Sequence, residues 1–189
     1  MVLLIELFQK YIDWKILSYF LQHPSQSVYV KELAKIIDVS PSSVSLALNK
    51  FREFGLVLKK EMGQTHFYKL NNDFIGISEL KKFFFLVQLH EVDFVNSLLK
   101  LDENIITVVL YGSFAAGDYD DLSDIDILVI APRKFKLNKL IEDFEDKLSR
   151  DLNIEILSIN QWTKLKERND PFYDNVKMNH VLLHGGELI

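Results

Sequence analysis

The sequence of 189 residues contains no cysteine, which excludes disulfide bonds and thiolate metal sites. A metal ion bound by this chain needs oxygen or imidazole ligands, and these favour hard cations such as Mg²⁺ or Mn²⁺. No stretch of about eighteen uncharged apolar residues occurs, so the sequence predicts no membrane-spanning segment. The apolar start of the chain carries several charged residues and lacks a basic n-region. It is therefore not expected to be a signal peptide, and the expected location is the cytoplasm.

The net charge of −5 is unevenly distributed along the chain. Residues 1–72 contain nine Lys and Arg against six Asp and Glu, whereas residues 73–189 contain thirteen against twenty-one. A chain divided in this way is expected to contain two parts with different partners.

The first part is predicted to form three helices and then a β-hairpin. Ser40 precedes Pro41 at the expected start of the third helix, and Gly55 follows its end, which are favoured N-terminal and C-terminal capping residues. The predicted elements are helices over residues 3–21, 31–37 and 42–54, a short strand over 28–30, and strands over 56–60 and 65–70 joined by a four-residue turn.

The second part is predicted to mix strands and helices around a small sheet. The expected elements are a long helix over residues 77–101, strands over 105–111, 125–130 and 154–159, and helices over 137–152, 162–168 and 171–181. The predicted fold class is α+β: a domain over residues 1–72 with the element order of a winged helix, a linking long helix over 73–103, and a small mixed-sheet α/β domain over 104–189.

The chemistry is concentrated where one predicted buried strand ends and the next begins. The first strand ends in Gly112-Ser113, and the second opens with Asp124 and Asp126. Gly112 has no Cβ and lets a phosphate approach the backbone. Ser113 adds a hydroxyl and is expected to begin a helix whose amides attract phosphate oxygens. Two carboxylates spaced two residues apart on a strand leave the same face and repel each other unless a cation lies between them.

A third carboxylate is expected from a neighbouring strand, and Glu155 is the candidate. It is the one charged residue inside the strand predicted over residues 154–159, where isoleucine flanks it on both sides. An ordinary edge-strand glutamate is the alternative. The acidic stretch between Asp118 and Asp126 could instead be a solvated loop. It does not fit a calcium-binding loop, because Leu122 occupies a ligand position and no glycine stands at the sharp turn.

On these motifs, residues 104–189 resemble the minimal nucleotidyltransferases of the DNA polymerase β-like superfamily. The resemblance implies an NTP donor such as ATP, two divalent metal ions, Mg²⁺ or Mn²⁺, and release of pyrophosphate. It implies that Gly112 and Ser113 bind the triphosphate, that Asp124 and Asp126 bind metal, and that Glu155 binds the second metal and helps to activate the acceptor hydroxyl. Small relatives act as antitoxins on HEPN-type toxins, which makes a HEPN-type protein an expected partner.

One position departs from the family pattern. Many members carry arginine just before the glycine that follows Gly-Ser, and here that residue is Ala116. Arg133 or Lys134 could supply the missing cation. The loss of the arginine keeps a second function open, in which a transcription regulator uses a transferase-like domain only to sense a nucleotide.

Residues 11–70 separately resemble winged-helix DNA-binding domains, which implies binding to double-stranded DNA and a homodimer. Lys59 and Lys60 on the predicted hairpin would reach an adjacent phosphate backbone. The alternative is that the helix over residues 42–54 packs against the second domain. The outward-facing side chains of that helix are small donors and cations suited to phosphates and base edges, namely Ser42, Ser43, Ser45, Asn49, Lys50 and Arg52.

Overall fold

The computed structural model describes residues 12–188, and the chain divides into two compact units, residues 1–84 and 85–189. The division lies inside one helix, α5 (Ile77–Glu91). Part of the predicted first helix lies outside the described residues, and its described part is α2 (Ile12–Gln22). Within residues 12–188, no helix is both long enough and apolar enough to cross a bilayer.

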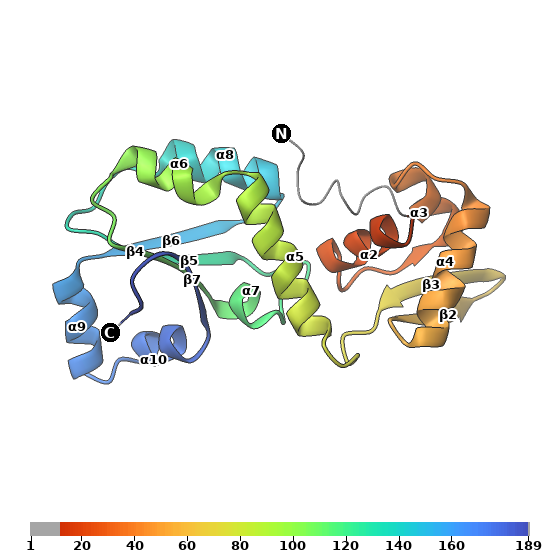
Figure 1. Ribbon diagram of the computed structural model, residues 1–189. Coiled ribbons are helices and arrows are strands. Elements are labelled where there is room, and N and C mark those ends of the chain that lie inside the picture. The colour runs from red at the N-terminus through yellow and green to blue at the C-terminus, as the bar shows by residue number, and fades with distance from the viewer. Residues whose placement is uncertain (1–11, 189) are drawn as a thin grey trace. The chain divides into compact units, whose positions relative to one another are not determined.

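Unit 1 contains the predicted three helices and hairpin in the predicted order (Figure 1). Its antiparallel sheet has the order β1-β3-β2, and the core beneath the helices contains the fully buried Phe20, Leu33 and Leu48. Besides α2, the elements are β1 (Val28–Tyr29), α3 (Val30–Ile36), α4 (Pro41–Phe54), β2 (Val57–Met62) and β3 (Thr65–Leu70).

The ends of α4 and the hairpin turn follow from local residue chemistry. The Ser40 hydroxyl accepts a hydrogen bond from the Ser43 amide, and Gly55 ends the helix in a left-handed conformation with φ 86°, as predicted. The prediction of a four-residue turn between the hairpin strands is wrong. Met62 pairs with Thr65, so only two residues form the turn, the first being Gly63 with φ 63°.

Unit 2 is built on a mixed four-stranded sheet with the order β6-β5-β4-β7. The neighbours β5 and β6 are parallel, and the other two pairs are antiparallel. Besides the end of α5, the elements are α6 (Phe94–Leu101), β4 (Thr107–Tyr111), α7 (Gly112–Ala116), β5 (Ile125–Ile130), α8 (Asn138–Leu148), β6 (Leu152–Leu157), α9 (Ile159–Glu167), α10 (Pro171–Met178) and β7 (His180–Gly185).

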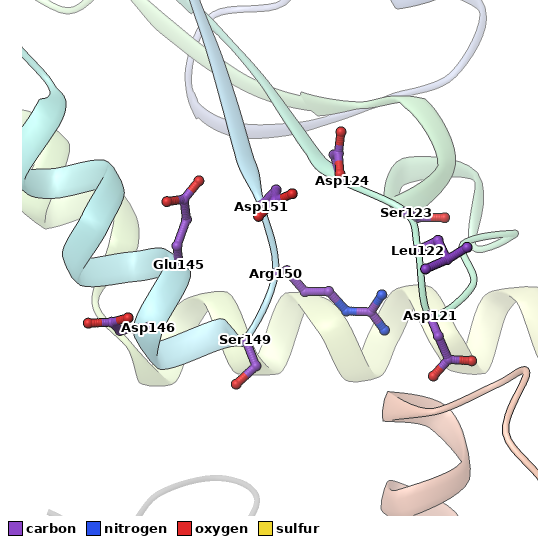
Figure 2. A pocket seen from close by; sticks show the side chains of 9 residues that line it. All are labelled: Asp121, Leu122, Ser123, Asp124, Glu145, Asp146, Ser149, Arg150 and Asp151. Carbon is purple, nitrogen blue, oxygen red and sulfur yellow. The ribbon is translucent and has the colours of Figure 1, made fainter.

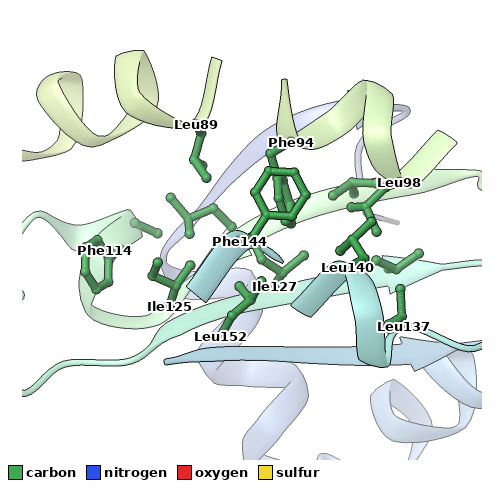
Figure 3. Close-up of a cluster of buried hydrophobic side chains, with 14 of the residues drawn as sticks. Leu89, Phe94, Leu98, Phe114, Ile125, Ile127, Leu137, Leu140, Phe144 and Leu152 are labelled. Carbon is green, nitrogen blue, oxygen red and sulfur yellow. The ribbon is translucent and has the colours of Figure 1, made fainter. Parts of the chain in front are cut away.

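Helices cover both faces of this sheet, which explains why most residues of β4 and, apart from Asp126, of β5 are buried (Figure 1). On one face, α5, α6 and α8 pack their apolar side chains on β5 (Figure 3). The rings of Phe94 and Phe144 meet edge to face there, with their centroids 5.0 Å apart. On the other face, Trp162 of α9 and Tyr173 of α10 pack against Leu128. Full burial of such side chains contributes about 1.5 to 3 kcal/mol each, so the two cores hold the sheet rigidly between the helix layers.

The predicted helix over residues 77–101 is two helices. Asp93 adopts the left-handed conformation with φ 57° and separates α5 from α6. Asp tolerates this conformation better than most residues, and its carboxylate accepts hydrogen bonds from Asn96 and Lys100 of α6. The segment contains neither glycine nor proline, and its apolar residues keep the helical period across the break. The sequence therefore contains no local signal that predicts the end of α5.

The chain between β5 and the end of the unit also differs from prediction. α8 ends at Leu148 because Ser149 turns left-handed with φ 52°, and β6 runs over Leu152–Leu157 instead of residues 154–159. The predicted helix over residues 171–181 ends at Met178. The following segment forms β7, which pairs with β4. Its apolar run is too short to distinguish a strand from a helix by periodicity.

Candidate active site

A sharp turn at Gly112 brings the end of β4 against Asp126. Gly112 has φ 70°, a conformation that favours glycine. A Cβ at this position would lie 2.5 Å from Oδ2 of Asp126. The room left by the missing side chain is therefore filled by a carboxylate of the predicted metal pair. Ser113 follows as the second residue of α7, a helix of five residues that begins one residue before the predicted start.

The loop that leads to Asp124 is fixed by Asp120. The carboxylate of Asp120 accepts hydrogen bonds from the Leu122 amide at 2.9 Å and the Ser123 hydroxyl at 3.0 Å. These two donors hold the pKa of Asp120 below its usual value, the Leu122 amide having the larger effect. Arg150 donates to the carbonyl oxygen of Asp120 at 2.7 Å. The acidic segment is thus an ordered turn that presents Asp124 at the start of β5.

Asp124 and Asp126 lie on the same face, as the predicted strand requires. Ile125 and Ile127 are fully buried in the core beneath α6 and α8, so the alternating Asp side chains are directed to the other face. A single atom, Nδ2 of Asn153, donates to Oδ2 of Asp124 and to Oδ1 of Asp126, both at 3.3 Å. One hydrogen-bond donor therefore bridges the two carboxylates.

Charge interactions connect Asp126 to Asp124 and Tyr111 to the carboxylates of Asp126 and Glu155. Burial raises the pKa of Asp126, the charge of Asp124 adds to the rise, and the hydrogen bond from Asn153 opposes it. Tyr111 pairs with Asp126 across β4 and β5. Burial raises the pKa of Tyr111 to about 12, with added contributions from the charges of Asp126 and Glu155. The hydroxyl of Tyr111 therefore interacts electrostatically with the carboxylates of Asp126 and Glu155.

Glu155 shares this face but does not complete a metal-binding group. In the parallel pairing of β5 and β6, Asn153 lies beside Asp126, and Glu155 lies beside Leu128. Glu155 instead forms an ion pair with Lys134 at 3.6 Å. Across residues 12–188, no three His, Asp or Glu side chains are grouped so that they could hold one metal ion. The expected convergence of Asp124, Asp126 and Glu155 is absent from this structure.

Of the two cations expected to replace the family arginine, only Lys134 is placed beside a predicted site residue. Arg133 pairs with Asp102 at 3.5 Å. Lys134 pairs with Glu155, and its side chain is largely exposed. Ala116 is the last residue of α7.

A cavity of about 410 Å³ opens beside Asp124 (Figure 2). Arg150 extends toward the loop that carries Asp121 and Leu122. Glu145 accepts a hydrogen bond from the Leu152 amide, which fixes the start of β6. Five carboxylates and one guanidinium line this cavity, so its surface is strongly acidic. The lining residues are Asp121, Leu122, Ser123, Asp124, Glu145, Asp146, Ser149, Arg150 and Asp151.

The side chains predicted to contact DNA lie on α4 and β2 of unit 1. Ser42, Lys50, Arg52 and Lys60 are exposed, and Ser43, Ser45, Asn49 and Lys59 are partly exposed. Three of the cations have acidic neighbours: Lys50 lies 3.4 Å from Asp13, Arg52 lies 3.9 Å from Glu53, and Lys59 lies 3.2 Å from Glu61. Exposed ion pairs of this kind contribute about 0 to 1 kcal/mol, so these acidic neighbours hold the cations only weakly.

Comparison with known families gives a match that covers part of the chain. Residues 94–184 match the family model described as Polymerase beta, Nucleotidyltransferase. The matched segment runs from α6 to β7 and contains Gly112, Ser113, Asp124, Asp126 and Glu155. The recognised nucleotidyltransferase segment therefore lies entirely in unit 2. No curated protein matches the chain.

Several solved structures are similar to parts of the chain. Reduced HlyU from Vibrio cholerae N16961 is 28% identical, with 41% of this chain and 75% of that chain covered and a TM-score of 0.32. A putative nucleotidyltransferase from Sulfolobus solfataricus is 21% identical, with 62% and 100% covered and a TM-score of 0.32. A toxin-antitoxin structure with AMP-PNP is 19% identical, with 50% and 73% covered and a TM-score of 0.37.

Two residues of the site were not predicted from the sequence, Asn153 and Tyr111. Asn153 precedes Glu155 by two residues, so strand alternation alone places both on one face. Tyr111 directly precedes the Gly-Ser motif on a strand expected to be buried. The sequence pattern is therefore sufficient to place both residues, but Asn153 and Tyr111 are uncharged and were not predicted as candidate metal-site residues.

Proposed function

We propose that unit 2 transfers a nucleotidyl group from an NTP, ATP in the first instance, to a hydroxyl acceptor, using Mg²⁺ or Mn²⁺ held by Asp124 and Asp126. The observation that carries this proposal is the arrangement of these carboxylates. They lie on one face, one hydrogen-bond donor bridges them, and Asp126 packs into the space left by Gly112. The match of residues 94–184 to the nucleotidyltransferase family supports the same conclusion.

The residues present fit a divalent cation. Asn153 places a partly positive N–H group between the two carboxylates, which is the kind of charge this position stabilises. Carboxylate oxygens are also the ligands that Mg²⁺ and Mn²⁺ prefer. Bound there, the metal would supply Lewis-acid activation of the attacking oxygen and neutralise charge on the leaving group.

The proposed reaction forms one P–O bond and breaks another. The acceptor oxygen attacks the α-phosphorus, the bond to the β-phosphate oxygen breaks, and pyrophosphate leaves with the electron pair. Gly112 and Ser113 are proposed to position the triphosphate. Glu155 is proposed to accept the acceptor proton and to act as the further metal ligand, for which it must leave Lys134, its partner at 3.6 Å.

Lys134 is proposed to take the role of the arginine that Ala116 replaces. Released from Glu155, its ammonium group would be available to a phosphate oxygen on the same side of the sheet. If no cation serves this role, the second candidate function applies, in which unit 2 binds a nucleotide without transferring it and the chain acts as a regulator. The alanine at position 116 is the observation that favours this alternative.

For unit 1 we propose binding to double-stranded DNA through α4 and the hairpin. The hydroxyl groups of Ser42, Ser43 and Ser45 suit phosphate and base-edge contacts, and Lys50 and Arg52 follow two turns later on the same helix. The exposed Leu46, with 62% of its surface accessible, lies within this set and suits contact with a thymine methyl group. A homodimer, and a HEPN-type protein as acceptor in an antitoxin-like or autoregulatory role, complete the proposal.

Nucleotide-dependent stabilisation of the full chain tests the site in unit 2. We expect Mn²⁺ with ATP to raise the melting temperature of the wild type, because only the folded state assembles the site. Asp124→Ala should abolish the rise, whereas Asp118→Ala, which removes a carboxylate elsewhere in the same loop, should retain it. Loss of the rise in both variants, or in neither, would place the nucleotide elsewhere.

A further inference from the structure

Asn153 has a position that packing does not explain. It lies near the start of β6, an edge strand of the sheet, and its side chain is exposed. Asparagine is depleted in strands because it neither packs well nor favours the extended backbone. The side chain nevertheless donates two hydrogen bonds, which the carboxylates of Asp124 and Asp126 accept.

The pairing register explains why Asn153 and not Glu155 makes these contacts. Because β5 and β6 are parallel and in register, Asn153 lies directly beside Asp126, and Glu155 lies beside Leu128. The amide nitrogen reaches across to both Asp124 and Asp126. Lying between the two carboxylates, this N–H group offsets the repulsion between their charges.

An amide side chain can serve both states of such a site. Its nitrogen donates to carboxylates, and its oxygen is a ligand for hard cations. A rotation about the Cβ–Cγ bond exchanges the two atoms and requires no movement of the backbone. Neither a leucine nor an aspartate at this position has both properties.

We propose that Asn153 is a positioning residue of the metal pair. It bridges Asp124 and Asp126 through Nδ2 in the metal-free chain, and it turns its Oδ1 toward the cation when one is bound. This inference rests on the proposed function, since it takes the two aspartates to be the metal ligands. It assigns to Asn153 the place between Asp124 and Asp126, beside the expected cation.

Titration of Mn²⁺ into the full chain, followed by the loss of the free-ion paramagnetic resonance signal, tests the inference. We expect Asn153→Ala to weaken Mn²⁺ binding about tenfold, as loss of an orienting partner does at other metal sites. Asn153→Asp supplies an oxygen but no donor, so it should bind Mn²⁺ at least as tightly as the wild type. In EDTA the same variant should melt below the wild type, because three carboxylates then repel one another.

The matched control is Asn96→Ala, since Asn96 of α6 also donates to a carboxylate, that of Asp93. It should leave Mn²⁺ binding unchanged. A purely structural Asn153 would be revealed by both of its variants melting lower in EDTA while Mn²⁺ affinity stays within twofold, and this result would overturn the inference. If Asp126→Asn also bound Mn²⁺ like the wild type, the proposed metal site itself would fail.

Discussion

Replacing Gly112 by alanine tests whether Asp126 depends on the space beside this residue. The substitution adds a Cβ at φ 70°, where it would lie 2.5 Å from Oδ2 and 3.4 Å from Cγ of Asp126. The carboxylate must therefore move. Because Asp has a short side chain, the movement also breaks its alignment with Asn153. We expect Gly112→Ala to lose Mn²⁺ and nucleotide binding together with part of the stability of unit 2.

The expected cost has two parts. A left-handed conformation costs a residue with a Cβ roughly 1 to 2 kcal/mol, and loss of the hydrogen bond from Asn153 costs about 1 kcal/mol more. The total cost is about 2 to 3 kcal/mol. Each kcal/mol lowers the melting temperature of a unit of this size by roughly 4 to 8 °C. Gly63 has a similar φ of 63° with nothing within 4 Å of its Cβ position, so Gly63→Ala should show only the backbone cost.

Urea unfolding of the single variants and of the double variant Gly112→Ala with Asp126→Ala measures the coupling. Once the carboxylate is absent, Gly112→Ala should cost about 1 kcal/mol less than it does in the wild type. Equal costs in the two backgrounds would refute the contact between Gly112 and Asp126. A cost for Gly112→Ala no larger than that for Gly63→Ala would do the same.

Three further predictions concern charge. The raised pKa of Asp126 means that its carboxylate binds a proton more tightly in the folded protein than in the unfolded chain. The contribution of Asp126 to stability is therefore greatest below the unfolded pKa of about 3.9, and it is lost as the pH rises through the pKa of the folded protein. At neutral pH in EDTA, Asp126→Asn should therefore melt above the wild type, by roughly 2 to 4 °C, and below it once Mg²⁺ and ATP are added. Lys50→Ala should weaken binding to duplex DNA and lower the salt slope by about 1, whereas Lys139→Ala, on α8 of the other unit, should not. Lys134→Ala should raise the KM for ATP about tenfold without changing the melting temperature in EDTA; an unchanged KM would remove this lysine from the site.

The sequence predicts the part of the site that depends on local geometry. Strand alternation places Asp124 and Asp126 on one face, and β5 has the predicted bounds, residues 125–130. The capped helix α4 also begins and ends beside the predicted Ser40 and Gly55. In each case the signal lies within a few residues of the feature that it predicts.

The third residue of the site depends on register, which local patterns do not contain. Alternation places Asn153 and Glu155 on the same face, but only the pairing of two distant strands decides which of them adjoins Asp126. The same limit applies to β7, whose pairing with β4 joins residues far apart in the sequence. The break at Asp93 was missed for another reason, because a left-handed aspartate leaves no change in the apolar period.

Transfer of label from ATP tests nucleotidyl transfer most directly. The full chain is incubated with Mn²⁺, ATP labelled at the α-phosphate and an extract of the cells that naturally express it, and macromolecule-bound label and pyrophosphate are measured. The wild type should transfer the α-phosphate label and release pyrophosphate, and Asp126→Asn, which keeps the shape of the side chain and removes its charge, should do neither. ATP binding by the wild type without transfer, or equal labelling by wild type and variant, would contradict catalysis at Asp124 and Asp126.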